Sequence, residues 1–287
     1  MSAHHSLALD HLTVADTTPS QLIEIAGAVG ARAVCMFLEP MAVLPRMPWF
    51  DLYGPTPERY ETKLRMNDLG IGLDLAYPFT LSGRTDVAAF RPALETASFL
   101  GARAVNVLVY DREPARRTEV FERFCILALA HGLQVALEFY PPSQVRTLTD
   151  AVSLAQTAEA PGQVGVNVDL LHLIRSGNGP RDLLDAPPGA VFYAQFCDAP
   201  ATCAMERREG EASSHRLYPG EGELDVAGFA EALPYGVSAS VEAPREDLIL
   251  AGVPPGERAR RAVEAVLKVT ADHTEEIMKL QNVRPHQ

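Results

Sequence analysis

Cysteine is scarce in this sequence, and closely spaced cysteine pairs are missing. The four cysteines, Cys35, Cys125, Cys197 and Cys203, lie in or beside apolar runs. Disulfide frameworks and structural zinc sites are built from cysteines at short, regular spacings. Neither is expected here, and the pattern predicts reduced thiols that pack among core residues.

Basic residues are also in deficit, since 25 Lys and Arg face 37 Asp and Glu and leave a net charge of −12. Nucleic-acid binding depends on clustered positive charge, so a nucleic acid is not an expected partner. No apolar run approaches the ~20 residues that span a bilayer, and the opening MSAHHSLALDHL lacks a basic region followed by an apolar core. We expect a cytoplasmic protein that acts on a small-molecule substrate, without a membrane partner.

Signatures of two large enzyme classes are missing as well. The chain has no Gly-x-Ser-x-Gly or Walker sequence, so serine hydrolase and P-loop chemistry lack support. Internal repeats, low-complexity tracts and linkers rich in Gly, Ser or Pro are not found either. Residues 1–287 are therefore predicted to form one domain.

The sequence does contain eight short apolar runs, each followed by a segment of helical pattern. This alternation is typical of a parallel sheet, and 287 residues suit a single (β/α)8 TIM barrel, which usually has ~250. The predicted strands are residues 7–12, 33–38, 72–77, 104–110, 134–139, 165–170, 191–196 and 238–242. Helices are predicted to start at Thr18-Pro19, Thr56-Pro57 and Thr149-Asp150.

Two long connections, residues 39–57 and 198–222, follow predicted strands and so belong to the face that carries the active sites of TIM barrels. The first is unusually apolar and includes Trp49. Loops of this length are usually functional or interfacial. It is predicted either to fold over the barrel mouth as a lid, with Trp49 against the substrate, or to pack against a second subunit in a homo-oligomer.

Four acidic or amide side chains lie where an apolar run ends, namely Glu138, Asp169, Gln195 and Glu242. Strand ends gather at the mouth of a barrel, so these oxygens would converge there. A salt bridge or a core hydrogen bond explains any one of them alone, but the four together favour a metal site. An all-oxygen set suits Mn²⁺ or Mg²⁺ better than Zn²⁺, and we expect one such divalent cation.

A divalent metal at this place suggests chemistry on a hydroxy-carbonyl compound. Neighbouring substrate oxygens would chelate it, and it would stabilise the enediolate that forms when a proton leaves the adjacent carbon. Glu138 or Glu242 is the predicted base. His172, three residues after Asp169, is a second acid or a hydrogen-bond donor to the substrate.

With these residues the sequence resembles the xylose-isomerase-like TIM barrels, broadly sugar phosphate isomerases and epimerases. The resemblance spans nearly the whole chain and rests on Glu138, Asp169-x-x-His172, Gln195-x-x-Asp198, Arg216-x-x-Pro219-Gly220-Glu221-Gly222 and Glu242. It implies metal ligands at Glu138, Asp169, Gln195 and Glu242. It also implies that His172 and Arg216 bind substrate or assist proton transfer.

Gln195 separates the branches of this superfamily. Sugar isomerases and epimerases usually have a histidine at this position, whereas glutamine there is similar to the 3-dehydroshikimate dehydratases, whose ligand spacings are also similar. The DNA-repair endonuclease branch needs a larger set of histidines for several zinc ions than this catalytic face offers.

Two further side chains near strand ends are candidates for substrate contacts, Tyr77 and His11, although both types also serve there in packing or structural hydrogen bonds. The leading prediction is a metal-dependent sugar isomerase or epimerase. A dehydratase (lyase) of 3-dehydroshikimate or inosose type is the alternative, because it begins with the same proton removal. A non-catalytic sugar-binding barrel is the alternative of another class.

Overall fold

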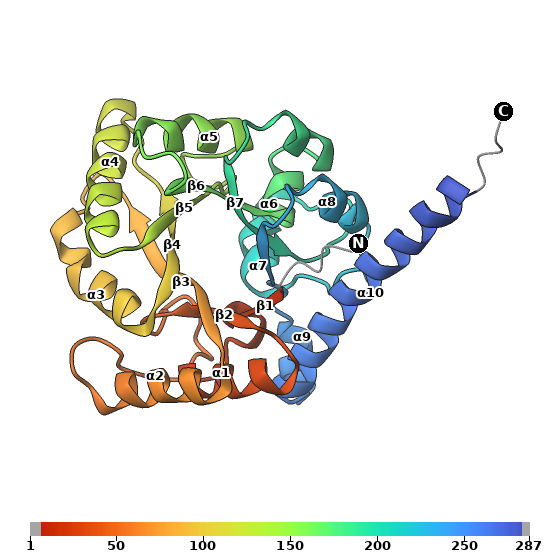
Figure 1. Cartoon of the computed structure of the whole chain (residues 1–287), viewed down its shortest axis with the longest axis horizontal. Coiled ribbons are helices and arrows are strands. Elements are labelled where there is room, and N and C mark those ends of the chain that lie inside the picture. Colours follow the sequence, from red (N-terminus) through yellow and green to blue (C-terminus); the bar gives the residue numbers. More distant parts are fainter. Residues whose placement is uncertain (1–6, 283–287) are drawn as a thin grey trace.

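The computed structural model describes residues 7–282, with side chains described to residue 271. Eight parallel strands pair in chain order and close into a barrel through β8 and β1, as predicted (Figure 1). The strands are β1 Leu7–Asp10, β2 Ala33–Phe37, β3 Gly72–Leu81, β4 Ala102–Val109, β5 Gln134–Glu138, β6 Val164–Asp169, β7 Val191–Phe196 and β8 Ser238–Val241. Most of their residues are buried, because helices cover the outer face of a parallel barrel.

Helices surround the barrel, and α10 runs along it and extends past its edge (Figure 1). The helices are α1 Pro19–Ala28, α2 Pro57–Leu69, α3 Arg91–Leu100, α4 Pro114–Ala130, α5 Leu148–Thr157, α6 Leu170–Arg175, α7 Arg208–Ser214, α8 Val226–Ala232, α9 Glu246–Leu250 and α10 Pro255–Asn282, with short 3-10 helices η1 His11–Val14, η2 Val87–Phe90, η3 Pro180–Asp185 and η4 Met205–Arg207. Within residues 7–282 no helix is both long and apolar enough to cross a membrane.

Side-chain caps fix where several helices begin. Thr18 and Thr56 cap α1 and α2, as predicted, each accepting a backbone N–H of the first turn. The start predicted for α5 at Thr149-Asp150 is wrong. Thr147 is the N-cap instead, because Asp150 bonds back to its backbone and completes a capping box.

All strands except β7 differ from their predicted bounds at one or both ends, and for β1 and β3 the physical cause is clear. β1 stops at Asp10, because this side chain accepts the N–H of Leu12 and starts η1. β3 continues to Leu81, four residues beyond the prediction, since Phe79 and Leu81 pair with Val107 and Val109 of β4. A side-chain hydrogen bond therefore ends β1 early, whereas pairing with β4 extends β3.

The two long connections lie after β2 and β7, on the face where the strands end. In the first, Phe50 and Leu52 are buried and anchor the loop to the core. The side chain of Trp49, directly before Phe50, is 78% exposed. The second connection contains η4 and α7 and leads to Arg216. Both connections thus begin where a substrate would enter.

Candidate active site

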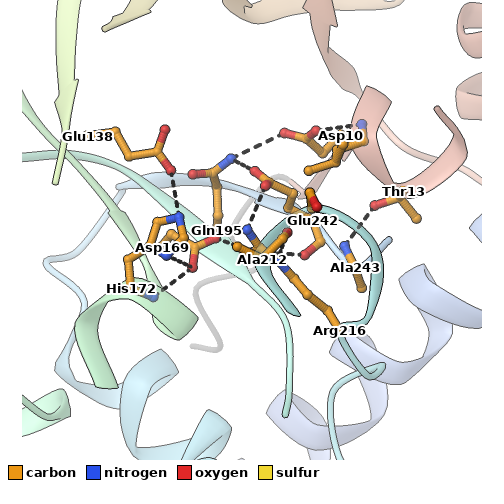
Figure 2. A network of polar contacts seen from close by, with 12 residues as sticks. Asp10, Thr13, Glu138, Asp169, His172, Gln195, Ala212, Arg216, Glu242 and Ala243 are labelled. Carbon is orange, nitrogen blue, oxygen red and sulfur yellow. Dashed lines mark hydrogen bonds and ion pairs between the residues drawn. The ribbon is translucent and has the colours of Figure 1, made fainter. Parts of the chain in front are cut away.

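A cavity of about 310 Å³ opens at the carboxyl ends of the strands. Its polar lining includes Glu138, His172, Gln195, Arg216 and Glu242. The remaining walls are mainly apolar or aromatic and include Leu12, Phe37, Met41, Val43, Phe79, Leu108, Tyr110 and Tyr140. The strand-end residues singled out from the sequence therefore meet at one place (Figure 2).

Arg216 connects two of these strand ends. Its guanidinium donates to Asp169 and, at 2.9 Å, to Oε1 of Glu242. Nε donates to the carbonyl of Ala212 at 2.8 Å, and the whole side chain is 1% exposed. A buried guanidinium with two carboxylate partners is held firmly in place, because moving it would leave its own charge and two buried carboxylates without their partner.

Gln195 lies between the other polar groups of the site. Its Nε2 donates to Glu242 and, at 3.3 Å, to Oδ2 of Asp10. Its Oε1 accepts from Nδ2 of Asn167 at 2.5 Å. In this arrangement the amide nitrogen of Gln195, and not its oxygen, faces the carboxylate of Glu242 (Figure 2).

Glu138 and His172 form the opposite side of the site. Oε1 of Glu138 is 3.5 Å from Nε2 of His172, and Oε2 accepts from Nδ2 of Asn106 at 2.6 Å. Asp169 caps α6 by accepting the N–H of His172, which fixes the histidine next to the carboxylates. The ring of Tyr140 lies 4.8 Å from the imidazole, centre to centre, and is tilted by 56° against it.

Sequence reasoning missed three members of this network, Asp10, Asn106 and Asn167. Asp10 ends β1 just as Asp169 ends β6, so the pattern that identified the others also applies to it. The two asparagines stand inside apolar strands, a place where an amide needs a partner. That signal is the same as the one given by Gln195.

Burial and mutual repulsion govern the electrostatics. Burial raises the pKa of Asp10 to about 6, although hydrogen bonds from Tyr77 and Leu12 act in the opposite direction and lower it. Burial and the nearby Asp169 charge raise the pKa of Glu138 to about 8. Burial lowers the pKa of His172 to about 4, so this imidazole is neutral near pH 7. Asp169 differs: burial is the largest single effect and raises its pKa, but the nearby charges, Arg216 first, together with the hydrogen bonds from Arg216 and the N–H of His172, outweigh it and lower the pKa.

The donor set and its charge fit a divalent cation. Asp10, Glu138, Asp169 and Glu242 are all buried, and the described cavity lining includes one cationic side chain, Arg216. Ionising all of these groups together is costly, as the raised pKa values of Asp10, Glu138 and Glu242 indicate, and a bound cation would offset that cost. Ligand atoms of Glu138, Asp169 and His172 lie within 4.8 Å of one another.

This geometric group differs from the predicted ligand set, since it includes His172. All four predicted ligands have protein partners in this structure. Arg216 contacts both Asp169 and Glu242, and Asn106 donates to Glu138. The amide of Gln195 turns its nitrogen to Glu242 and its oxygen to Asn167. The assignment of all four predicted ligands, with either Mn²⁺ or Mg²⁺, stays a prediction.

The predicted substrate contacts fall into two groups. Tyr77 and Arg216 line the cavity, although the hydroxyl of Tyr77 donates to Asp10. His11 and Trp49 are not among the residues that line it. The ring nitrogens of His11 contact the carbonyl of Thr17 and the N–H of Phe37, a structural arrangement. The residues of the 39–57 loop that line the cavity are Met41 and Val43.

Asp198 shapes the loop that carries Arg216. Its Oδ1 accepts the N–H groups of Ala199 and Leu224, and its Oδ2 accepts those of Gly220 and Gly222, at 2.8–3.0 Å. A side chain at Gly222 would clash, because its Cβ would lie 2.3 Å from Oδ1 of Asp198. The loop therefore wraps closely around a buried carboxylate.

These observations define a (β/α)8 barrel with a buried acidic site, an arginine and a histidine at the mouth where the strands end. The chain belongs to the xylose isomerase-like TIM barrel family, whose model matches residues 21–269.

One relative with a similar sequence and two solved structures with a similar fold can be compared with this chain. A 3-dehydroshikimate dehydratase from Pseudomonas aeruginosa is 32% identical over 119 residues, which is 41% of this chain and 18% of that protein. The chain thus matches less than a fifth of the length of this relative. The solved structure of the IOLI protein with a bound zinc atom has a TM-score of 0.74 at 17% identity, covering 93% and 99% of the two chains. D-allulose 3-epimerase from Methylomonas sp. has a TM-score of 0.67 at 15% identity, covering 94% and 100%. Both structures show likeness of fold.

The surroundings of His11 predict a specific pH dependence of stability. Burial lowers the pKa of His11 to about 4, whereas an unfolded histidine titrates near ~6.5. Below that pH the unfolded state binds the additional proton, so stability falls as the pH falls. Between pH 7.5 and 5.5 this group should remove about 1–1.5 kcal/mol of unfolding free energy. Urea unfolding of the wild type and His11→Gln should show a smaller decrease in the variant, and equal decreases would refute the structural role.

The clamp around Asp198 predicts that Asp198→Asn is destabilising although it preserves shape. An amide has one acceptor oxygen, so N–H groups of the loop would lose their partner, at a cost on the order of 2–5 kcal/mol in unfolding free energy. Asp225→Asn is the matched control, because this exposed N-cap of α8 accepts from Gly228 and should lose about 1 kcal/mol or less. Denaturant titration measures both, and equal losses would argue against the clamp.

Proposed function

We propose that this chain is a divalent-metal-dependent enzyme that removes a proton next to a carbonyl group of a small polyhydroxylated substrate. The observation that carries the proposal is the burial of Glu138, Asp169 and Glu242 around Arg216 at one cavity. Perturbed carboxyl groups that converge in a concave site are typical of catalysis and are poorly explained by packing.

Glu138 is the base that the contacts favour. Both oxygens of Glu242 already have partners, Arg216 on Oε1 and Gln195 on Oε2. Glu138 has one short hydrogen bond, from Asn106, and it lines the cavity. A base must reach its proton directly, so the carboxylate with the freer oxygen is the better candidate.

His172 and Arg216 complete the proposed machinery. His172 is neutral and lies beside Glu138, so it can donate a hydrogen bond to a substrate oxygen or return a proton to it. Arg216 holds Asp169 and Glu242 in place and reaches the cavity. Glu138, Asp169, Glu242 and Gln195 would hold the cation, which supplies charge stabilisation at the substrate's carbonyl oxygen when bound.

The size and lining of the cavity limit the substrate. About 310 Å³ suits a single small ring or a short sugar, and apolar walls would face its carbon skeleton. Arg216 is the cationic side chain of the described lining, and carboxylates already engage it. A phosphate group would lack an Arg or Lys partner there, which favours a substrate without one.

Loss of water is the outcome that we place first. The sequence by itself favours isomerisation or epimerisation, but one free base suits elimination. The Glu138–His172 pair takes the carbon-bound proton and returns a proton to the β-hydroxyl, which leaves as water. The stretch that matches a 3-dehydroshikimate dehydratase at 32% identity agrees with this order.

Isomerisation or epimerisation is the second candidate. Glu242 also lines the cavity, so a second carboxylate is present for reprotonation at the carbon. The two outcomes share their first step and differ in where the proton goes.

Product analysis in D₂O decides between the outcomes. With Mn²⁺ or Mg²⁺ supplied, we expect mass spectrometry to show loss of water from 3-dehydroshikimate or an inosose. Incorporation of deuterium at unchanged composition, in these or in a ketohexose, would instead establish the isomerase or epimerase. Glu138→Gln should lower kcat by about 10²–10⁴-fold, the usual contribution of a general base.

The control for this assay is Glu206→Gln, which changes an exposed glutamate of the 198–222 connection and should leave turnover unchanged. Binding without any chemical change in every compound would contradict an enzyme and favour a sugar-binding barrel.

Metal binding is a separate expectation. The dialysed protein should bind about one Mn²⁺ per chain, and Glu138→Ala combined with Asp169→Ala should abolish this, because both remove proposed ligands. Elemental analysis after gel filtration measures the content, with Glu206→Ala combined with Asp225→Ala as the control of equal charge change. A wild type that binds no Mn²⁺ or Mg²⁺ would refute the cation site.

A further inference from the structure

A chain of three amide side chains crosses the barrel interior from Glu138 to Glu242. Asn106 on β4 donates to Oε2 of Glu138 at 2.6 Å. Asn167 on β6 donates from Nδ2 to Oδ1 of Asn106 at 3.1 Å and to Oε1 of Gln195 at 2.5 Å. Gln195 on β7 donates in turn to Glu242. Two carboxylates of the proposed cation site are thus connected through neutral amides.

Both asparagines occupy a place that TIM barrels usually fill with apolar side chains. Alternate strands contribute side chains to common layers inside the barrel, and Val, Ile and Leu dominate there. Asn167 is 0% exposed and Asn106 is 7% exposed. Burying an amide is costly unless its polar groups are bonded, and these bonds lead to Glu138 and Gln195. The two asparagines therefore serve the site rather than the packing.

One atom of this chain has no partner. Oδ1 of Asn167 is buried and accepts no hydrogen bond from the described residues. An amide has a donor end and an acceptor end, so Asn167 can meet Gln195 in two ways. At present its nitrogen donates to Oε1 of Gln195; with both amides turned over, its oxygen would accept from Nε2. A hard cation needs the oxygen of Gln195, and the second arrangement frees it.

We propose that Asn167 is a positioning residue that allows Gln195 to change from a hydrogen-bond donor toward Glu242 into an oxygen ligand of the cation. Asn106 must turn over with them, because its Oδ1 now accepts from Nδ2 of Asn167 and would otherwise face Oδ1 of Asn167; its present hydrogen bond to Glu138 is then given up. The inference rests on the proposed cation site. Leucine at position 167 could support neither orientation of Gln195, whereas aspartate, as an acceptor, would support the orientation that turns Oε1 toward the cation.

The first test is Mn²⁺ affinity by isothermal titration calorimetry on the full chain. Asn167→Leu should weaken binding about 10–100-fold, the usual effect of removing a partner of a metal ligand. Asn167→Asp should bind at least as tightly as the wild type. Ser240→Ala is the control, because Ser240 is another buried polar side chain of the barrel whose Oγ has no hydrogen-bond partner among the described residues, and it should leave affinity unchanged.

The second test reads the orientation of Gln195 without using activity or affinity. Its side-chain N–H signals, assigned by their loss in Gln195→Glu, should show a nuclear Overhauser effect to the Hβ protons of Asn167 after Mg²⁺ is added. In Asn167→Asp the corresponding effect should be present before Mg²⁺ is added. If Asn167→Leu does not fold, this measurement on the other two proteins decides.

Wild-type affinity in a folded Asn167→Leu, or nuclear Overhauser effects that Mg²⁺ leaves unchanged in the wild type, would overturn the role of Asn167. Failure of the cation site itself is distinguishable, because the wild type would then bind no Mn²⁺ at all. Normal binding in Asn167→Leu together with none in the Glu138→Ala, Asp169→Ala double variant would refute the positioning role and leave the site intact.

Discussion

The placement of Arg216 between Asp169 and Glu242 is the interaction on which the rest of the site depends. A carboxylate that is buried without a partner is costly, and so is a buried guanidinium. The strand ends therefore need the loop that brings Arg216, and the loop needs the strand ends. Asp198 holds the loop in the shape that brings Arg216 to the strand ends, because its carboxylate accepts hydrogen bonds from backbone N–H groups of the loop. Sheet and loop stabilise each other at the place where chemistry is proposed.

The barrel itself could be predicted from the sequence, because its causes are local and repeated. Apolar runs alternate with helical segments, and eight such units have few ways to pack other than a closed parallel sheet. Closure then forces the strand ends together, which is why Glu138, Asp169, Gln195 and Glu242 meet as expected. Asp10 could have been found by the same rule, since it also ends an apolar strand.

Other features depend on contacts between distant parts of the chain, and the sequence does not reveal them. His11 follows a strand end, yet its ring is turned to backbone groups of Thr17 and Phe37. Trp49 is the most conspicuous residue of its loop, yet Phe50 takes the buried position and Met41 reaches the cavity. Which side chain of an apolar loop turns inward is decided by the surface beneath it, and propensity carries no information about that.

The same division explains why the type of reaction can be argued further than the substrate. The floor of the cavity consists of strand ends and one clamped arginine, whose positions are fixed by barrel closure and buried hydrogen bonds. Its walls include Met41, Val43 and Tyr110, which come from connections between strands and helices. Rigid positions supply the precise geometry that acid–base chemistry needs, whereas connecting segments vary freely in sequence and adjust shape. A fold of this kind keeps its chemistry while its walls change, so the substrate must be read from the walls of each chain.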